Sequence, residues 1–250
     1  MKKHIAALVL TALVLSPVCF AQSYSWYFKP TKDFSQPQCI PEASFVDKYN
    51  TIYLGHPEKK KVYLTFDAGY ENGNVEKILN ILKKQEVPAA FFVLPQIVKE
   101  HTDLIERMHE EGHLVCNHTK THRNMSKVTD FETFKAELCG AEEVFREATG
   151  REMDKFYRPP EGSFSEQNLE FADKLGYTTV FWSLAYADWD DAKQMSPDKA
   201  LELVLSRTHN GSVILLHPTS KTNAEMLEQY ITKLKELGYE FCSLNDFDGK

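Results

Sequence analysis

Five apolar, strand-like runs in this chain each lead into a short cluster of reactive polar side chains, and amphipathic, helix-like stretches separate them. The clusters contain Asp67, His118 with His122, Arg158, Asp188, and His217. Strand and helix repeated in this way predict parallel strands with right-handed crossovers. The C-terminal ends of the parallel strands of an α/β barrel share one face, where such barrels place their chemistry. We therefore predict an α/β fold, a (β/α) barrel with about seven parallel strands, whose active site gathers all five clusters.

Hydrophobic periodicity and glycine positions set the expected element boundaries. Strands are predicted at 61–67, 89–94, 114–117, 156–158, 178–184, 212–217 and 239–243. Helices are predicted at 74–85, 96–111, 130–149, 165–175, 198–209 and 223–237.

The N-terminus has the order of a secretory leader. Lys2 and Lys3 precede an apolar stretch, Ile5 to Leu15, that is too short to span a bilayer. Small residues follow, so we expect cleavage before Gln22 and an exported protein. An uncleaved anchor is the alternative.

The expected organisation is a signal peptide at 1–21, an N-terminal extension at 22–58 and a catalytic domain at 59–250. The extension contains four prolines, which predict a segment without regular secondary structure. Its aromatic residues indicate that it packs on the domain.

Charge and cysteine content exclude several classes of protein. Loss of Lys2 and Lys3 with the leader would change the formal net charge from −7 to −9. An acidic chain is unsuited to nucleic acid and is compatible with an uncharged or partly cationic glycan. Of the four cysteines that remain, none forms a CxxC pair, which argues against a structural zinc cluster and leaves any disulfide pairing open. Nothing in the sequence indicates a stable protein partner.

Asp67 and Arg158 are candidates for one catalytic pair. A carboxylate at a strand end can act as a general base, although a lone Asp is more often a turn or helix-cap residue. Arg158 precedes two prolines and a glycine, a stiff loop that can present backbone N–H groups to an oxyanion. Its guanidinium could keep Asp67 ionised, or could form a purely structural salt bridge.

Histidines supply the remaining chemistry. His118 and His122 have a spacing that can bring two imidazoles to one metal ion, beside which a third ligand is expected. His109 and His113 have the same spacing, but we expect them on a solvated helix face. His217 ends an apolar run and could protonate a leaving amine, with Asp188 keeping it charged.

The motifs resemble those of polysaccharide deacetylases with the NodB homology domain, carbohydrate esterase family 4. The resemblance covers roughly residues 59–245 and rests on five motifs in family order: Thr-Phe-Asp at 65–67, His-Thr-Lys-Thr-His at 118–122, Arg-Pro-Pro-Glu-Gly at 158–162, Asp-Trp at 188–189 and Ile-Leu-Leu-His at 214–217. The run at 65–73 is similar to that of the spore-cortex branch that makes muramic δ-lactam. For an exported protein, this similarity implies that it is secreted or held in the cell wall or forespore intermembrane space.

This resemblance implies a distorted barrel with fewer than eight full units, and hydrolysis of an N-acetyl group on a sugar. It implies Asp67 as base, Arg158 as its partner, His217 as acid and Asp188 as its tuner. It also implies the following roles: metal ligands, His118 and His122; oxyanion donor, the backbone N–H of Glu161; walls of the acetyl pocket, Trp189 and Leu215.

The sequence departs from the family pattern at two positions. Ala68 stands where the family has a second Asp as the third metal ligand, and where the spore-cortex branch typically has Asn. We therefore expect a divalent metal ion, zinc or similar, to be held weakly. Glu161 occupies a position that is often aromatic in the family, which could reshape the sugar site.

Three functions remain open at this point. The favoured one is an exported deacetylase of N-acetylmuramic acid in peptidoglycan, acting on glycan strands after an N-acetylmuramoyl amidase has removed the stem peptide. The second is a deacetylase of N-acetylglucosamine in peptidoglycan or chitin-like oligomers. The third is an inactive glycan-binding domain.

Overall fold

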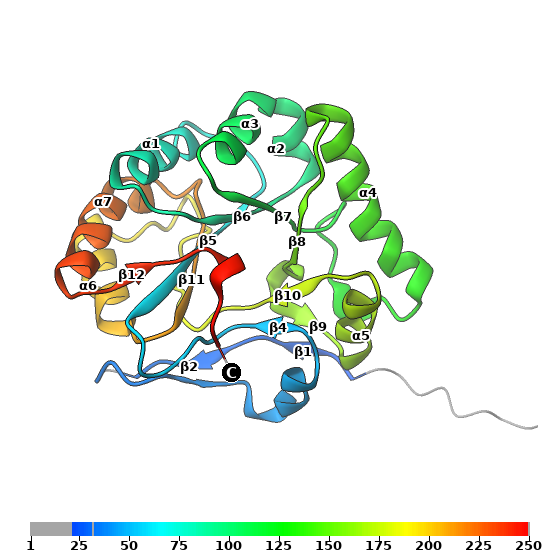
Figure 1. Cartoon of the computed structure of the whole chain (residues 1–250), viewed down its shortest axis with the longest axis horizontal. Coiled ribbons are helices and arrows are strands. Elements are labelled where there is room, and N and C mark those ends of the chain that lie inside the picture. Colours follow the sequence, from blue (N-terminus) through cyan, green and yellow to red (C-terminus); the bar gives the residue numbers. More distant parts are fainter. Residues whose placement is uncertain (1–21, 32, 250) are drawn as a thin grey trace, which may run out of the picture.

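The computed structural model describes residues 22–31 and 33–249, so the predicted leader at 1–21 lies outside the described residues. At its centre is a curled sheet of seven parallel strands in the order β11-β5-β6-β7-β8-β10-β4 (Figure 1). Their bounds are β4 Thr51–Ile52, β5 Lys61–Ala68, β6 Ala90–Val93, β7 Leu114–Asn117, β8 Asp154–Tyr157, β10 Thr178–Val180 and β11 Ser212–Leu216. The predicted α/β barrel with about seven parallel strands is confirmed.

Single bridges bring the two ends of the sheet together. Leu184 pairs with Ile214 in parallel, and Leu54 pairs with Ser212 in antiparallel fashion, so the chain after β10 and β4 lies against β11. The strand predicted at 178–184 stops at Val180. The chain then leaves its position between β8 and β4, and Leu184 lies beside Ile214 of β11.

Helices form a layer on the outside of the curled sheet (Figure 1). Their bounds are α1 Val75–Gln85, α2 Pro95–Glu100, α3 Thr102–Glu110, α4 Phe131–Thr149, α5 Glu166–Lys174, α6 Pro197–Arg207 and α7 Lys221–Glu236. Each turns an apolar stripe inward, as Ile78, Leu79 and Leu82 of α1 show by being completely buried. This interface is the largest core cluster of the domain.

The helix predicted at 96–111 is two helices. Backbone angles of φ −138° and ψ 52° at His101 interrupt the helical path, and the His101 carbonyl then accepts the first bonds of α3, from Leu104 and Ile105. Apolar periodicity continues across the break, which is why the sequence did not reveal it.

The extension at 22–58 is more regular than predicted, and it contributes a strand to the main sheet. It contains β1 Tyr24–Ser25, β2 Phe28–Lys29, β3 Gln38–Cys39 and the 3-10 helix η1 Pro41–Lys48 before β4. The part of the extension before β4 runs below β4 and β10 in the view of Figure 1, at the opposite end of the molecule from α1 and α3. β1 pairs antiparallel with β9, Ser163–Phe164.

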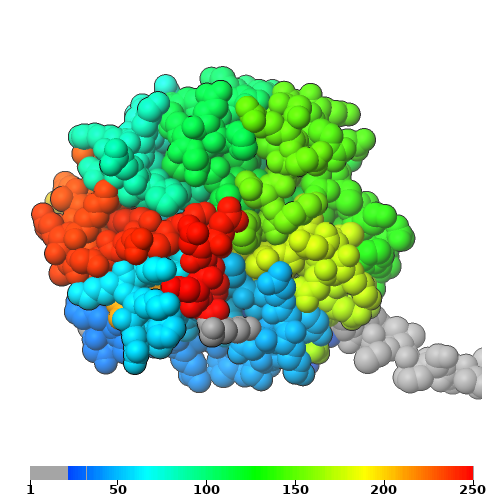
Figure 2. All heavy atoms as spheres, viewed as in Figure 1, coloured from blue at the N-terminus to red at the C-terminus, as the bar shows by residue number. Residues whose placement is uncertain are grey.

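The C-terminal segment closes one face of the molecule. The segment predicted as a strand at 239–243 is only β12, Glu240–Phe241, which pairs with the start of β5 beside the main path of the sheet. The 3-10 helix η4, Leu244–Asp246, follows, and Asp248 then bonds to Lys59, Lys61 and Tyr63. In Figure 2 these red residues lie across the face beside the blue and cyan N-terminal residues. Two further 3-10 turns are η2 Met125–Lys127 and η3 Pro160–Gly162.

No helix in the described part of the chain is both long and apolar enough to cross a membrane.

Candidate active site

Asp67 and His217 lie side by side at the C-terminal ends of neighbouring strands. β5 and β11 are parallel, and Phe66 pairs in register with Leu216, so the next residue of each strand is Asp67 and His217. The sequence separation of these residues is large, and only the parallel pairing brings them together.

Arg158 is buried completely and directs its guanidinium at Asp67. Its Nη1 donates to Asp67 Oδ1 at 2.7 Å, and its Nη2 donates to Thr65 Oγ1 at 2.8 Å. The backbone carbonyls of Val180 and Phe181 accept from Nε and Nη2, and the guanidinium lies 4.2 Å from the centre of the Phe92 ring. The predicted salt bridge between Arg158 and Asp67 is therefore present, and its geometry fixes the direction of the carboxylate.

The surroundings of Asp67 favour its ionised form. Burial raises the pKa of this carboxyl, but the positive charge of Arg158 and the hydrogen bond from it outweigh burial, and the pKa of Asp67 lies below its usual value. The side chain keeps 12% of its surface exposed. Asp67 is thus an ionised carboxylate with one oxygen bound to Arg158 and the other facing His118, whose Nε2 is 3.6 Å from Asp67 Oδ2.

Asp188 holds His217 in a defined orientation. Asp188 is 1% exposed, and its Oδ1 is 2.7 Å from His217 Nδ1 while its Oδ2 accepts from the His217 backbone N–H at 2.8 Å. Burial lowers the pKa of His217, but the hydrogen bond and charge of Asp188 outweigh it and raise the pKa above 6.5. Nδ1 is committed to Asp188, so Nε2 is the nitrogen free to exchange a proton with a substrate.

The Asp188–His217 pair predicts a specific pH dependence. An acid that must be protonated loses activity as pH rises through its pKa, so the basic limb of kcat/KM should lie above pH 6.5. Asp188→Asn removes the charge that raises this pKa and should shift the basic limb to lower pH. The pH profiles of both forms test this, with Asp191→Asn, whose parent carboxylate bonds to Tyr70, as a charge-matched control in the same loop. An unmoved limb in Asp188→Asn would rule out His217 as the titrating acid.

His118 and His122 lie in the loop after β7, with ring centres 5.1 Å apart. His118 Nδ1 is 2.9 Å from the Arg158 carbonyl, so Nδ1–H donates to that oxygen and Nε2 keeps its lone pair. Burial lowers the pKa of His118 to about 4, so its ring is neutral. The loop is held by Glu137, which accepts from the backbone N–H and hydroxyl of Thr121.

The other three predicted site residues differ in exposure. Glu161 is exposed in the turn after Arg158 and has a left-handed backbone, with φ 58°. Trp189 is 63% exposed, and its ring centre is 6.3 Å from that of His217. Leu215 is 5% exposed, on β11 two residues before His217.

Two polar residues that the sequence analysis missed support the catalytic pairs. Thr65 accepts a bond from Arg158, and Asn223 donates to Asp188 Oδ2 at 2.6 Å and to the His217 carbonyl at 3.0 Å. Asn223 lies in the first turn of α7, where its backbone N–H bonds to the capping Ser220, so the sequence reads it as part of a helix start. Thr65 precedes the Phe-Asp dipeptide and could have been singled out as facing the same side of the strand as Asp67.

One expectation about the histidines is wrong. His113 is only 4% exposed, its Nδ1 accepts from the Ala89 backbone N–H, and burial lowers its pKa to about 4. It begins the turn into β7 rather than continuing the solvated face of the helix that carries His109.

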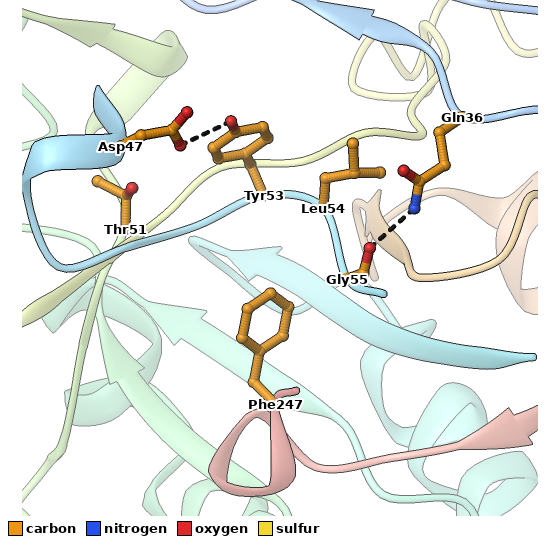
Figure 3. A pocket seen from close by; sticks show the side chains of 7 residues that line it. All are labelled: Gln36, Asp47, Thr51, Tyr53, Leu54, Gly55 and Phe247. Carbon is orange, nitrogen blue, oxygen red and sulfur yellow. Dashed lines mark hydrogen bonds between the residues drawn. The ribbon is translucent and has the colours of Figure 1, made fainter. Parts of the chain in front are cut away.

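A cavity of about 240 Å³ lies away from these residues (Figure 3). It is lined by the N-terminal extension and by Phe247, which packs on Tyr63. The candidate site residues do not line it, so the catalytic chemistry is not located there.

Comparison with known proteins identifies the class. The family model described as polysaccharide deacetylase matches residues 55–180. The peptidoglycan-N-acetylmuramic acid deacetylase PdaA of Bacillus subtilis is 40% identical over 89% of this chain and 84% of that protein. The solved structure of PdaA, a family 4 carbohydrate esterase, covers 90% of this chain and 97% of that chain with a TM-score of 0.86 and 38% identity. A peptidoglycan-N-acetylglucosamine deacetylase of Bacillus cereus is 34% identical over 80% of this chain and 73% of that protein.

The chain belongs to the polysaccharide deacetylases of carbohydrate esterase family 4. It is a hydrolase of the N-acetyl amide bond.

Deacetylases of this family generally depend on a metal ion. Within residues 22–31 and 33–249, no three His, Cys, Asp or Glu side chains gather as a complete metal site. The donors that are present, the oriented Nε2 of His118 and the nearby ring of His122, fit a divalent ion that keeps water at its other positions.

Proposed function

We propose that this protein removes the N-acetyl group from N-acetylmuramic acid in peptidoglycan, outside the cytoplasm, as the step that enables muramic δ-lactam formation in the spore cortex. The observation that carries the chemistry is that Asp67 and His217 lie on neighbouring strand ends, each paired with a residue that shifts its pKa. Arg158 lowers the pKa of Asp67, which favours a base, and Asp188 raises the pKa of His217, which favours an acid. The similarity to PdaA over most of both chains supports the choice of sugar.

The proposed reaction is an attack of water on the acetyl carbonyl. Asp67 accepts a proton as the water oxygen bonds to the carbonyl carbon, and the backbone N–H of Glu161 donates to the oxygen that becomes negative. His217 then gives the Nε2 proton to the sugar nitrogen as the C–N bond breaks, and Asp188 stabilises the imidazolium. The products are acetate and a sugar with a free amine. Trp189 and Leu215 would wall the space for the acetyl methyl group.

His118 and His122 would hold the divalent ion, zinc or a similar metal, which when bound polarises the acetyl carbonyl and lowers the pKa of water. With only two protein ligands, we expect this ion to be held loosely and lost during purification.

Ala68→Asp tests the reason for weak metal binding. Ala68 is completely buried in the core cluster that contains Phe66, so an unpaired carboxylate there should lower the stability of the metal-free protein. If the new carboxylate reaches the ion beside His118, added zinc should raise the melting temperature of the variant more than that of the parent. An equal or smaller zinc response in Ala68→Asp would contradict a shared site.

The choice of sugar follows from the chemistry of muramic acid. Its lactyl ether ends in a free carboxylate once an amidase has removed the stem peptide, and deacetylation places an amine within reach of that carboxylate to close a six-membered lactam with loss of water. We therefore expect activity on peptide-free muramic acid and dependence on prior amidase treatment.

Mass analysis of peptidoglycan fragments tests this expectation. Purified protein is incubated with amidase-treated and untreated peptidoglycan, and loss of acetyl is assigned to muramic acid or to glucosamine. Loss from muramic acid in the treated sample supports the proposal. Loss from glucosamine alone would instead establish the second candidate, which the similarity to the N-acetylglucosamine deacetylase of Bacillus cereus favours. A later loss of water would show that the ring closes in the same incubation.

A further inference from the structure

We propose that Trp26, in the N-terminal extension, is a positioning residue that holds the oxyanion-binding turn 158–162 in its active shape. Trp26 lies outside residues 55–180, which carry the family match. This inference rests on the proposed function, in which the backbone N–H of Glu161 binds the oxyanion.

The turn has a backbone that needs support from its surroundings. Glu161 has φ 58° and ψ 10°, and Gly162 has φ 62°, so two successive residues are left-handed. A non-glycine residue keeps this conformation only where the surrounding structure enforces it. The orientation of the Glu161 N–H, which the chemistry requires, depends on that conformation.

Two tryptophans, Trp26 and Trp182, lie close to Gly162 in the turn. A Cβ placed on Gly162 would be 2.8 Å from Cη2 of Trp182 and 2.9 Å from Cβ of Trp26, too close for any side chain. Glycine is therefore required at 162 for space as well as for its positive φ. The turn has no room to move toward Cη2 of Trp182 or Cβ of Trp26, so the positions of both tryptophans limit that of Gly162.

Trp26 is anchored by three contacts. Its backbone N–H donates to the Gly162 carbonyl at 2.8 Å, and its Nε1–H donates to the Trp182 carbonyl at 2.8 Å. Its indole stacks on Phe181 with ring centres 4.1 Å apart and an interplanar angle of 9°. The side chain is 4% exposed, so these contacts are shielded from water.

The same contacts reach the catalytic arginine. The Phe181 carbonyl accepts from Arg158 Nη2, and the Trp182 ring lies 5.8 Å from the guanidinium. Through these contacts Trp26 stabilises the position of Arg158, which orients Asp67, and that of the turn that contains Glu161. The hydroxyl of Ser23, three residues earlier, donates to the carbonyl of Ser126, which follows the loop that contains His118 and His122. The segment that contains Trp26 therefore contacts both this loop and the turn 158–162.

Kinetics with a tetrahedral inhibitor test this role. Trp26→Ala removes the indole bond and the stack, while Trp26→Phe keeps a stacked ring and removes only the bond to Trp182. Ile40→Ala is the matched control, because Ile40 is 3% exposed in the same apolar cluster but bonds through its backbone to Tyr27. For each, kcat and KM on acetylated glycan are measured with the inhibition constant of a methylphosphonamidate analogue of the N-acetyl sugar.

The expected result is a loss confined to the transition state. Because removing one oxyanion donor lowers kcat by about 10²–10³-fold, a displaced donor in Trp26→Ala should lower it by at least about tenfold with little change in KM. The phosphonamidate should bind more weakly by the same factor, since it mimics the tetrahedral state. Trp26→Phe should lose about fivefold, the effect of one hydrogen bond. Ile40→Ala should lose thermal stability but keep its inhibitor affinity.

Other outcomes would overturn the proposal. Unchanged kcat in both Trp26 variants, or a lower kcat with unchanged phosphonamidate affinity, would show that Trp26 acts only on folding. If Trp26→Ala does not fold, Trp26→Phe decides by the same two criteria. If the parent protein releases no acetate from any glycan, the proposed function itself fails, and this is distinct from an active parent with equally active variants.

Discussion

Asp67→Asn should lower kcat/KM for deacetylation on the order of 10²-fold or more, while the protein stays folded. The amide has nearly the shape of the carboxylate and can still accept the bond from Arg158 through Oδ1. It cannot take a proton from water, so the loss reports the base directly. The measurement is the rate of acetate release per mole of folded protein. Circular dichroism and the melting temperature are the controls for the fold.

Arg158 loses a charged partner in Asp67→Asn, and some loss of thermal stability is expected. Its bonds to Thr65, Val180 and Phe181 remain and should keep it in place. Near-normal activity in a folded Asp67→Asn protein would reject Asp67 as the base.

Arg158→Met should cost about 3–5 kcal/mol of unfolding free energy, the usual effect of leaving one member of a buried ion pair alone. Arg158 has no exposed surface, and the Asp67 carboxylate would lose its strongest opposing charge. The pKa of Asp67 should rise as a result, and deacetylation should be lost together with stability. Chemical denaturation at neutral pH measures the stability change.

The double variant Arg158→Met with Asp67→Asn separates charge from packing. Because no charge is then left unpaired, it should be more stable than Arg158→Met alone, yet equally inactive. A double variant no more stable than Arg158→Met would show that Arg158 stabilises the fold through its stacking on Phe92 rather than through Asp67.

Much of the main sheet could be predicted from sequence because β6, β7 and β11 are short runs in which every residue is buried. All five residues of β11 are buried, for example, and the predicted segment 212–217 differs from it by one residue. β4 was missed because Thr51–Ile52 is too short for a periodic signal and forms only where Phe181 bonds to the Ile52 carbonyl. The break at His101 was missed because it changes backbone angles and leaves the apolar pattern intact.

The site was predictable in part because Asp67 lies at the end of β5, and Arg158 and His217 directly follow β8 and β11. The pairings of Arg158 with Asp67 and of His217 with Asp188, suggested from the sequence, are present in the structure. What no local pattern indicated is the support around them. Asn223 reads as a helix-start residue, and Trp26 as one aromatic among several in a proline-rich segment.

The most direct test of the account is acetate release from amidase-treated peptidoglycan in water enriched in heavy oxygen, with zinc supplied. The account predicts acetate carrying one labelled oxygen, in an amount equal to the new amines on muramic acid, from the parent protein and not from Asp67→Asn. Acetate without label, or no acetate from the zinc-supplied parent, would contradict hydrolysis by a water activated at Asp67.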